Sequence, residues 1–217
     1  MKIFLDSTNI EEIREINKLG IIDGITTNPS LIAKSGKGFD QILKSICKEV
    51  KGPISAEVTA ENFENMLSEA KILSKISKNI VIKLPLTFNG LKACKHLTKK
   101  NYKTNVTLCF TVPQAILAAK AGATYISPFI GRLDDIGQNG VNLIRDIKKV
   151  FSNYTNFKTK ILAASVRSIE HVTEVAKAGA DISTIPPKIF HQLYKHELTD
   201  KGLKIFLEDW EKSKQKI

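Results

Sequence analysis

Cysteine is scarce in this chain. The three cysteines, Cys47, Cys94 and Cys109, are widely separated in a sequence of 217 residues. Small secreted proteins usually carry an even set of cysteines that form disulfides, and zinc sites usually carry C-x-x-C pairs. Neither pattern is present. We therefore expect a reduced, cytoplasmic setting for this protein.

Long hydrophobic runs are also missing. No segment approaches the roughly 20 apolar residues that a transmembrane helix needs. The apolar stretch within residues 1–10 is too short for the core of a signal peptide, and Asp6 interrupts it. The sequence therefore predicts neither a secretory signal nor a membrane partner.

Arginine is rare although the chain is basic. The formal net charge is +11, yet only four of the 33 basic residues are arginines. Sequence-specific binding of nucleic acids favours arginine and basic segments interleaved with aromatic residues. Here arginine is rare, and no basic segment is interleaved with aromatic residues. The lysines are spread along predicted helices, as on a solvated helix face, for example at Lys71, Lys95 and Lys99. We expect a general attraction to anions but no nucleic-acid partner.

Histidines that could bind a metal are missing as well. The four histidines show no metal-ligand spacing; they are His96, His171, His191 and His196. The sequence therefore predicts a metal-free site.

Short apolar segments alternate with segments of helical periodicity along the whole chain. The predicted strands cover residues 3–7, 24–28, 54–58, 80–84, 105–110, 125–130, 161–166 and 181–185. Alternation of this kind favours βαβ units and a parallel sheet.

An internal repeat indicates how many units there are. The sequence Ala-Lys-Ala-Gly-Ala occurs at 119–123 and again at 176–180, each time as the end of a predicted helix just before a strand. Two units of about 28 residues fit between these copies, and eight such units fill the chain. The sequence therefore predicts a single (β/α)8 TIM barrel domain over residues 1–217. A doubly wound open sheet is the alternative, but no G-x-G-x-x-G turn supports it.

The last residues of the chain, 199–217, form a predicted extra C-terminal helix. Four apolar residues lie on one stripe of it, namely Leu203, Phe206, Leu207 and Trp210. Because this helix has no strand of its own to cover, we expect it to pack across another surface.

Lys83 stands in an apolar run, Ile-Val-Ile-Lys-Leu-Pro at 80–85, that reads as a strand buried on both faces. Burial disfavours the charged form of an ammonium group, and a neutral lysine amine is nucleophilic enough to condense with a carbonyl. The alternative is a lysine at a strand end whose head reaches water.

Other polar residues stand at predicted strand ends, where the active sites of such barrels lie. Asp6 and Glu57 each follow an apolar strand. Four predicted strands each carry two candidate residues at positions two apart, and the pleat of a strand places such residues on the same face. The pairs are Thr26 with Asn28, Asn105 with Thr107, Ser127 with Phe129, and Ser165 with Arg167. Arg132 and Arg167 follow strands 6 and 7, where barrels often bind phosphate.

Several of these residues also have structural interpretations. Asp6 could cap the following helix, and Glu57 could pair with a helix lysine. Asn28 before Pro29 could simply form a turn. Arg132 could be held in an ion pair by Asp134 or Asp135.

The motifs around these residues resemble those of the transaldolase family, in particular the short transaldolases and the related fructose 6-phosphate aldolases. The similar segments are Phe-Leu-Asp at 4–6, Gly-Ile-Thr-Thr-Asn-Pro-Ser at 24–30, Ile-Lys-Leu-Pro at 82–85, Ser-Pro-Phe-Ile-Gly-Arg-Leu-Asp-Asp at 127–135 and Ala-Ala-Ser-Val-Arg at 163–167. They occur in order and span almost the whole chain.

The resemblance implies a Schiff-base aldol enzyme that needs no cofactor. It implies that Lys83 attacks the ketone of a ketose phosphate, that Asp6 takes the proton of the C4 hydroxyl, and that Glu57 shuttles protons through a water held by Thr107. Asn28, Asn105 and Ser127 would bind hydroxyl groups, with Thr26 and Phe129 beside them. Arg132, Ser165 and Arg167 would bind phosphate.

The same resemblance separates transfer from simple cleavage. The related aldolases carry tyrosine where this chain has Phe129 and glutamine where it has Glu57. Both residues here therefore imply a transaldolase of the pentose phosphate pathway, with a fructose 6-phosphate aldolase as the alternative. The family also implies a homo-oligomer, a ring-shaped pentamer or decamer, in which the C-terminal helix packs on a neighbour.

Overall fold

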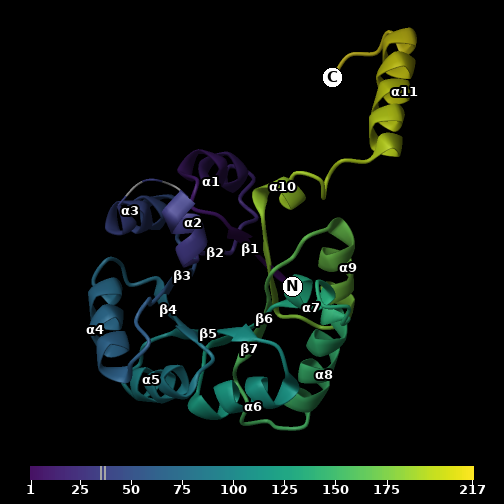
Figure 1. Ribbon diagram of the computed structural model, residues 1–217. Coiled ribbons are helices and arrows are strands. Elements are labelled where there is room, and N and C mark those ends of the chain that lie inside the picture. Colours follow the sequence, from purple (N-terminus) through teal and green to yellow (C-terminus); the bar gives the residue numbers. More distant parts are fainter. Residues whose placement is uncertain (35, 37) are drawn as a thin grey trace.

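The chain folds into a closed ring of parallel strands surrounded by helices. The computed structural model describes residues 1–34, 36 and 38–217. Eight strands close a barrel in sequence order, each parallel to its neighbours, with the eighth paired to the first. Figure 1 shows helices on the outside of this ring and the C-terminal helix standing away from it. The predicted (β/α)8 barrel is confirmed, and the open-sheet alternative is wrong.

All eight predicted strands are present, with ends that differ by a few residues. Their bounds are β1 Lys2–Asp6, β2 Gly24–Thr26, β3 Ile54–Glu57, β4 Ile80–Pro85, β5 Thr104–Cys109, β6 Tyr125–Pro128, β7 Lys160–Ala163 and β8 Ile182–Ile185. Strands β6 and β7 end earlier than expected, since the chain after β6 turns into a short helix and Ser165 after β7 adopts a positive φ of 60°.

Eleven helices are found in the described residues. They are α1 Ile10–Asn17, α2 Pro29–Lys34, α3 Phe39–Glu49, α4 Phe63–Ser74, α5 Phe88–Lys99, α6 Val112–Ala121, α7 Ile130–Asp134, α8 Gly140–Ser152, α9 Ile169–Lys177, α10 Pro187–Phe190 and α11 Glu197–Ser213. Most begin at a side chain that accepts backbone N–H groups; Thr111 and Gln114 form a full capping box at the start of α6.

The repeated glycines end their helices as the sequence predicts. Gly122 after α6 and Gly179 after α9 have φ values of 89° and 88°, in the left-handed region that favours glycine. Each therefore turns its helix directly into the next strand.

Two apolar clusters hold the barrel together. The larger one lies between the outer faces of the strands and the helices, and Ile25, Ile54 and Ile126 are among its fully buried members. The smaller one fills the barrel interior and consists of Phe4, Val81, Tyr125, Leu162, Ala164 and Ile182, with Phe129 packed against it. Because apolar side chains fill the lower barrel, the polar side chains of the strands are left for its carboxyl end.

The C-terminal helix α11 packs differently from the others. None of its residues is buried, and the predicted stripe is exposed, with Phe206 73% and Trp210 42% accessible. The expected helix is thus present, but within the described chain it covers no surface. Across those same residues, no helix combines the length and apolar character that crossing a membrane requires.

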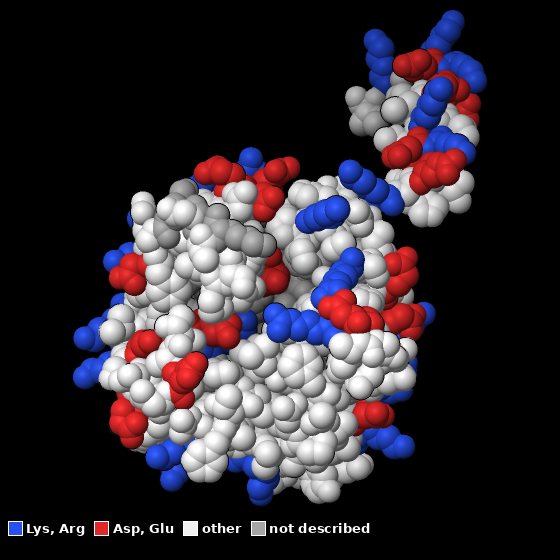
Figure 2. Space-filling view, in the orientation of Figure 1, with Lys and Arg blue, Asp and Glu red and all other residues white. Residues whose placement is uncertain are grey.

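The charged surface agrees with the interpretation of the lysines. Lys71, Lys95 and Lys99 are exposed on their helices. Figure 2 shows Lys and Arg side chains spread over the visible face with acidic side chains between them, not gathered into one continuous patch.

Candidate active site

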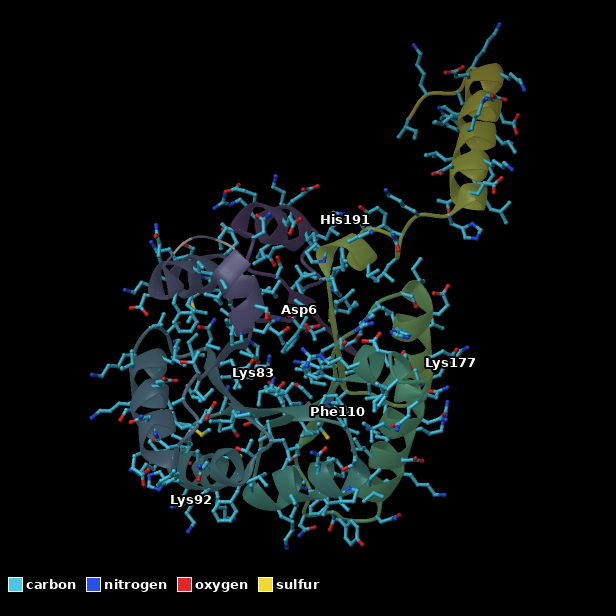
Figure 3. The ribbon with its side chains drawn as sticks, in the orientation of Figure 1. Asp6, Lys83, Lys92, Phe110, Lys177 and His191 are labelled. Atoms are coloured by element: carbon cyan, nitrogen blue, oxygen red, sulfur yellow. The ribbon has the colours of Figure 1, made fainter. Side chains whose placement is uncertain are left out.

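The site is centred on Lys83, whose side chain is only 6% exposed inside the barrel. Its Nζ lies 2.8 Å from Oε2 of Glu57 and donates a hydrogen bond of 3.0 Å to the backbone oxygen of Thr27. A buried ammonium requires such partners because it has lost its water. Lys83 is therefore not a strand-end lysine that reaches solvent. Figure 3 shows Asp6 and Lys83 within the ring, whereas Lys92 and Lys177 lie on the outside.

Strand register explains why the lysine has these neighbours. Glu57 on β3 and Asn105 on β5 are the register partners of Lys83 on β4. Partners in adjacent parallel strands point to the same face of the sheet. A carboxylate, an amine and an amide are thus set side by side by backbone pairing alone.

Asp6 supplies a second carboxylate. Its Oδ1 accepts a hydrogen bond of 2.9 Å from the hydroxyl of Thr26, and Thr26 Oγ1 lies 2.6 Å from Thr184 Oγ1. Burial raises the pKa of Asp6 above the ordinary aspartate value, with a smaller contribution from Glu57. The Lys83 charge and the Thr26 hydrogen bond oppose this rise in pKa.

Asn105 is held in a fixed orientation by two serines. Ser127 Oγ donates a 2.7 Å hydrogen bond to Asn105 Oδ1, and Asn105 Nδ2 donates a 3.1 Å hydrogen bond to Ser55 Oγ. All three residues are fully buried. The amide therefore presents one defined edge to the inside of the barrel.

Thr107 differs from its neighbours because its hydroxyl has no hydrogen-bond partner in the described part of the chain. Its Oγ1 is buried and makes no hydrogen bond to any residue that the structure describes. Buried hydroxyl groups are nearly always paired with protein or water. Thr107 thus has free capacity to bind a water or a ligand.

Phe129 closes another side of the site. Its ring packs edge-on against Phe110 at a centroid distance of 6.0 Å, and the guanidinium of Arg132 lies 5.2 Å from its ring centre. No hydroxyl group is available at this position.

The two arginines lie on adjoining loops. Gly131 N donates a 3.1 Å hydrogen bond to Ser165 O, which joins the start of α7 to the segment after β7. A Cβ at Gly131 would lie 2.3 Å from that oxygen and 2.7 Å from Arg167 Nε, so only glycine fits this contact. The contact brings Arg132, Ser165 and Arg167 to one cavity.

The acidic residues after Arg132 have other partners. Asp135 binds the guanidinium of Arg167, and this hydrogen bond lowers the pKa of Asp135. Asp134 Oδ2 lies 2.9 Å from Nε2 of His171. The interpretation that Asp134 or Asp135 holds Arg132 is therefore wrong; among the described residues Arg132 has no ion pair.

The remaining structural interpretations have mixed outcomes. Asn9, not Asp6, caps α1, and Glu57 pairs with Lys83 instead of a helix lysine. Asn28 does support a turn, since its Oδ1 accepts the N–H of Leu31 at 3.0 Å. Its side chain nevertheless lines the same cavity as Lys83.

One cavity of about 250 Å³ unites most of the candidate residues. Its lining includes nine of them: Asp6, Thr26, Asn28, Lys83, Ser127, Phe129, Arg132, Ser165 and Arg167. Glu57, Asn105 and Thr107 do not line it, although Glu57 contacts Lys83 and Asn105 contacts Ser127. The arrangement places a buried amine, one carboxylate and two guanidinium groups around a space of small-molecule size, with a second carboxylate, Glu57, in contact with the amine.

Sequence reasoning missed two residues of this region. Thr184 lines the cavity, and Ser55 orients Asn105. Thr184 stands in predicted strand 8, which contributed no candidate, and Ser55 stands two residues before Glu57. Period-two spacing back from Glu57 would have found Ser55, whereas nothing in strand 8 by itself distinguishes Thr184 from Ser183.

Comparisons with known proteins agree with this geometry. Residues 3–217 match the family model described as transaldolase/fructose-6-phosphate aldolase. The chain is 59% identical to a protein of Bartonella tribocorum named a probable transaldolase, over all of both chains. It is 58% identical to proteins of the same name from Brucella ovis and Rhizobium meliloti, again over full length.

A solved structure supports the fold alone. A thiamine phosphate pyrophosphorylase from Pyrococcus furiosus superposes with a TM-score of 0.59 at 15% identity, covering 88% of this chain and 93% of that one. The family match over nearly the whole chain, together with relatives near 58% identity, leads to one conclusion: this chain belongs to the transaldolase/fructose-6-phosphate aldolase family of enzymes.

Proposed function

We propose that this enzyme transfers a dihydroxyacetone unit from a ketose phosphate to an aldose phosphate through a Schiff base on Lys83. The donors would be sedoheptulose 7-phosphate or fructose 6-phosphate, and the acceptors glyceraldehyde 3-phosphate or erythrose 4-phosphate, as in the pentose phosphate pathway. The observation that carries the proposal is the buried Lys83 amine 2.8 Å from Glu57, in the cavity that Asp6 also lines.

The first step needs a neutral amine. Glu57 takes a proton from the Lys83 ammonium, and the amine attacks the C2 ketone of the donor. Loss of water then gives an iminium. Glu57 moves the protons of this dehydration through a water that Thr107 binds with its free hydroxyl. Proton transfers by positioned carboxylates typically contribute about 10²–10⁴-fold in rate.

Cleavage follows on the iminium. Asp6 takes the proton of the C4 hydroxyl, the C3–C4 bond breaks, and its electron pair moves into the iminium to form an enamine. An aldose phosphate leaves. The enamine then attacks the aldehyde carbon of the acceptor, Asp6 returns its proton, and hydrolysis frees the new ketose phosphate and Lys83. The iminium accepts the electron pair, so no metal ion is required.

Binding groups surround the reacting carbons. The Asn105 amide, fixed by Ser55 and Ser127, and the side chain of Asn28 bind hydroxyl groups of the three-carbon unit. Arg132, Ser165 and Arg167 bind the phosphate at the far end of the cavity, since guanidinium groups form strong paired hydrogen bonds to phosphate. Arg167 must break its ion pair with Asp135 before both of its terminal nitrogens can bind the phosphate.

A second candidate is the release of free dihydroxyacetone, as in a fructose 6-phosphate aldolase. Phe129 disfavours it because its ring lies beside the cavity and offers no proton to the enamine. The enamine then persists until an aldehyde arrives, and transfer prevails.

The test is reduction with borohydride in the presence of fructose 6-phosphate, followed by mass spectrometry of peptides. A three-carbon adduct on Lys83 is expected. An adduct on another lysine would move the site, and no adduct on the folded protein would refute the Schiff-base mechanism. Lys92, which lies over the Phe63 ring outside the barrel, is the internal control and should stay unmodified.

Assembly and location are part of the same proposal. We propose a cytoplasmic homo-oligomer, a pentamer or decamer ring, in which the exposed stripe of α11 packs on a neighbouring subunit. The support is the 42–73% exposure of Leu203, Phe206, Leu207 and Trp210, which is unusual for four large apolar residues on one helix.

A further inference from the structure

Thr184 is a buried polar residue at the carboxyl end of β8 whose hydroxyl faces the active-site cavity. It is 3% exposed and lines the same cavity as Lys83 and Asp6. Its Oγ1 lies 2.6 Å from Thr26 Oγ1, and among the described residues this is its only hydrogen bond. None of the roles assigned above uses it.

The contact crosses the strand that carries Asp6. Thr26 on β2 is the register partner of Asp6 on β1, and β8 is paired to the opposite side of β1. Thr184 and Thr26 therefore meet over β1 on the inner face of the barrel. Backbone pairing fixes both ends of this hydrogen bond.

The direction of the hydrogen bonds follows from counting protons. A hydroxyl group has one proton to donate. Thr26 donates its proton to Oδ1 of an ionised Asp6 at 2.9 Å, so the proton between the two threonines must come from Thr184. The chain thus runs from Thr184 to Thr26 to Asp6. Linked hydrogen bonds of this kind polarise and strengthen one another.

We propose that Thr184 is a positioning residue that holds Thr26 on Oδ1 of Asp6, leaving Oδ2 as the oxygen that accepts the proton of the substrate hydroxyl. This inference rests on the proposed role of Asp6 as the base. Within the described chain Oδ2 has no hydrogen-bond donor of its own. Without Thr184, the Thr26 hydroxyl can rotate away and both carboxylate oxygens compete for protons and for water.

Two consequences distinguish this role from simple packing. The carboxylate of Asp6 loses stabilisation, so it takes up a proton at higher pH; the charged groups around it, Lys83, Glu57, Arg132 and Arg167, remain unchanged. In addition, only C3–C4 cleavage is slowed, because Schiff-base formation depends on Lys83 and Glu57 and not on Asp6.

The test compares Thr184→Val with Thr184→Ser and Ser183→Ala in the full-length enzyme. The valine variant keeps the shape but removes the hydroxyl; the serine variant keeps the hydroxyl. Ser183 Oγ is also buried in β8 but has no hydrogen-bond partner among the described residues, so its removal controls for loss of a buried hydroxyl. If Thr184→Val does not fold, Thr184→Ala replaces it.

The expected result has two parts. For Thr184→Val, the acid limb of kcat/KM moves up by about half a pH unit, and kcat falls about 10-fold. Borohydride trapping with fructose 6-phosphate gives a higher ratio of six-carbon to three-carbon adduct on Lys83. Thr184→Ser and Ser183→Ala keep the wild-type acid limb of kcat/KM and the wild-type ratio of six-carbon to three-carbon adduct.

Other outcomes have separate meanings. A wild-type acid limb and adduct ratio in Thr184→Val would overturn the positioning role while leaving the Schiff-base mechanism intact. A change of equal size in Ser183→Ala would also overturn it, since the effect would then arise from loosening of β8. Failure of the wild-type enzyme to form any adduct on Lys83 would refute the proposed function itself.

Discussion

Lys83 Nζ and Glu57 Oε2 lie 2.8 Å apart, on register-paired residues of β4 and β3 that are 6% and 12% exposed in their side chains. A pair this close and this buried interacts strongly, and removing one partner leaves the other charge without compensation. Proton exchange between the two groups is also direct at this distance. The pair is therefore a structural element, and in the proposed mechanism it is also the route by which the amine becomes neutral.

Glu57→Gln should separate these two functions. Glutamine can still accept a hydrogen bond from Lys83 but cannot take its proton. We expect kcat to fall about 10²–10³-fold, with slow formation of the borohydride-trapped adduct measured over time. Glu64→Gln, at an exposed position of α4, is the control and should trap at the wild-type rate. An unchanged trapping rate in Glu57→Gln would exclude Glu57 as the proton carrier.

Asp6→Asn should abolish most activity without loss of stability. Burial raises the pKa of Asp6, so its ionised form is unfavourable in the folded protein, and stability falls as pH rises through the folded-state pKa. A neutral asparagine avoids this cost. We expect kcat to fall about 10²–10⁴-fold and the thermal midpoint at pH 7 to rise, with the gain vanishing at acid pH. A lower midpoint at pH 7 would contradict the direction of the shift.

The acid limb of the wild-type pH profile follows from the same raised pKa. The base must be ionised to act, so kcat/KM should decline as the pH falls through the pKa of Asp6. The midpoint of this decline should lie above the pKa of an ordinary aspartate, which is roughly 4. In Asp6→Asn the residual activity should lack this limb. A limb that persists in the variant would assign it to another group.

Phe129→Tyr should shift the enzyme from transfer towards cleavage. The phenol would lie beside Phe110 and the cavity, where it could protonate the enamine. We expect more free dihydroxyacetone from fructose 6-phosphate, measured by a coupled assay without acceptor. Phe157→Tyr, in the Phe151 and Tyr154 cluster, is the control and should release none. No gain in Phe129→Tyr would count against the proposed basis of transfer.

Arg132→Ala and Arg167→Ala should weaken binding of phosphorylated substrates selectively. We expect KM for fructose 6-phosphate to rise about 10–100-fold, as for loss of a charged hydrogen bond of about 1.5–3 kcal/mol. Trapping of unphosphorylated dihydroxyacetone on Lys83 should change little. Arg145→Ala, at an exposed position of α8 where the side chain contacts Asn142, is the matched control. Equal losses with both ligands would place the arginines outside a phosphate site.

Deleting residues 199–217 should reduce the size of the particle. None of α11 is buried in the chain itself, so the barrel should stay folded, which its circular dichroism spectrum reports. Light scattering coupled to size exclusion gives the mass. An unchanged mass would reject the role of α11 in assembly.

The sequence by itself determined the eight strands, their parallel order and most of the residues that line the candidate site. The apolar runs and the repeated helix-ending glycines specify the strand and helix units locally, and Gly122 and Gly179 have the left-handed φ that the repeat predicts. Once a barrel is assumed, period-two spacing places Lys83, Asp6 and Glu57 on the inner face at one end. Local sequence patterns therefore suffice to place a side chain on the inner face when that placement depends only on the strand that carries it.

Only the tertiary structure decided how residues from different strands pair. Asp135 binds Arg167 and not Arg132, because the chain after β7 crosses over the start of α7. Thr184 meets Thr26 because β8 closes the ring beside β1, a contact between residues 158 positions apart. Such pairings depend on barrel closure and loop geometry, which no single segment encodes. The sequence thus specified most of the polar groups that face the cavity, and closure of the barrel specified which of them contact one another.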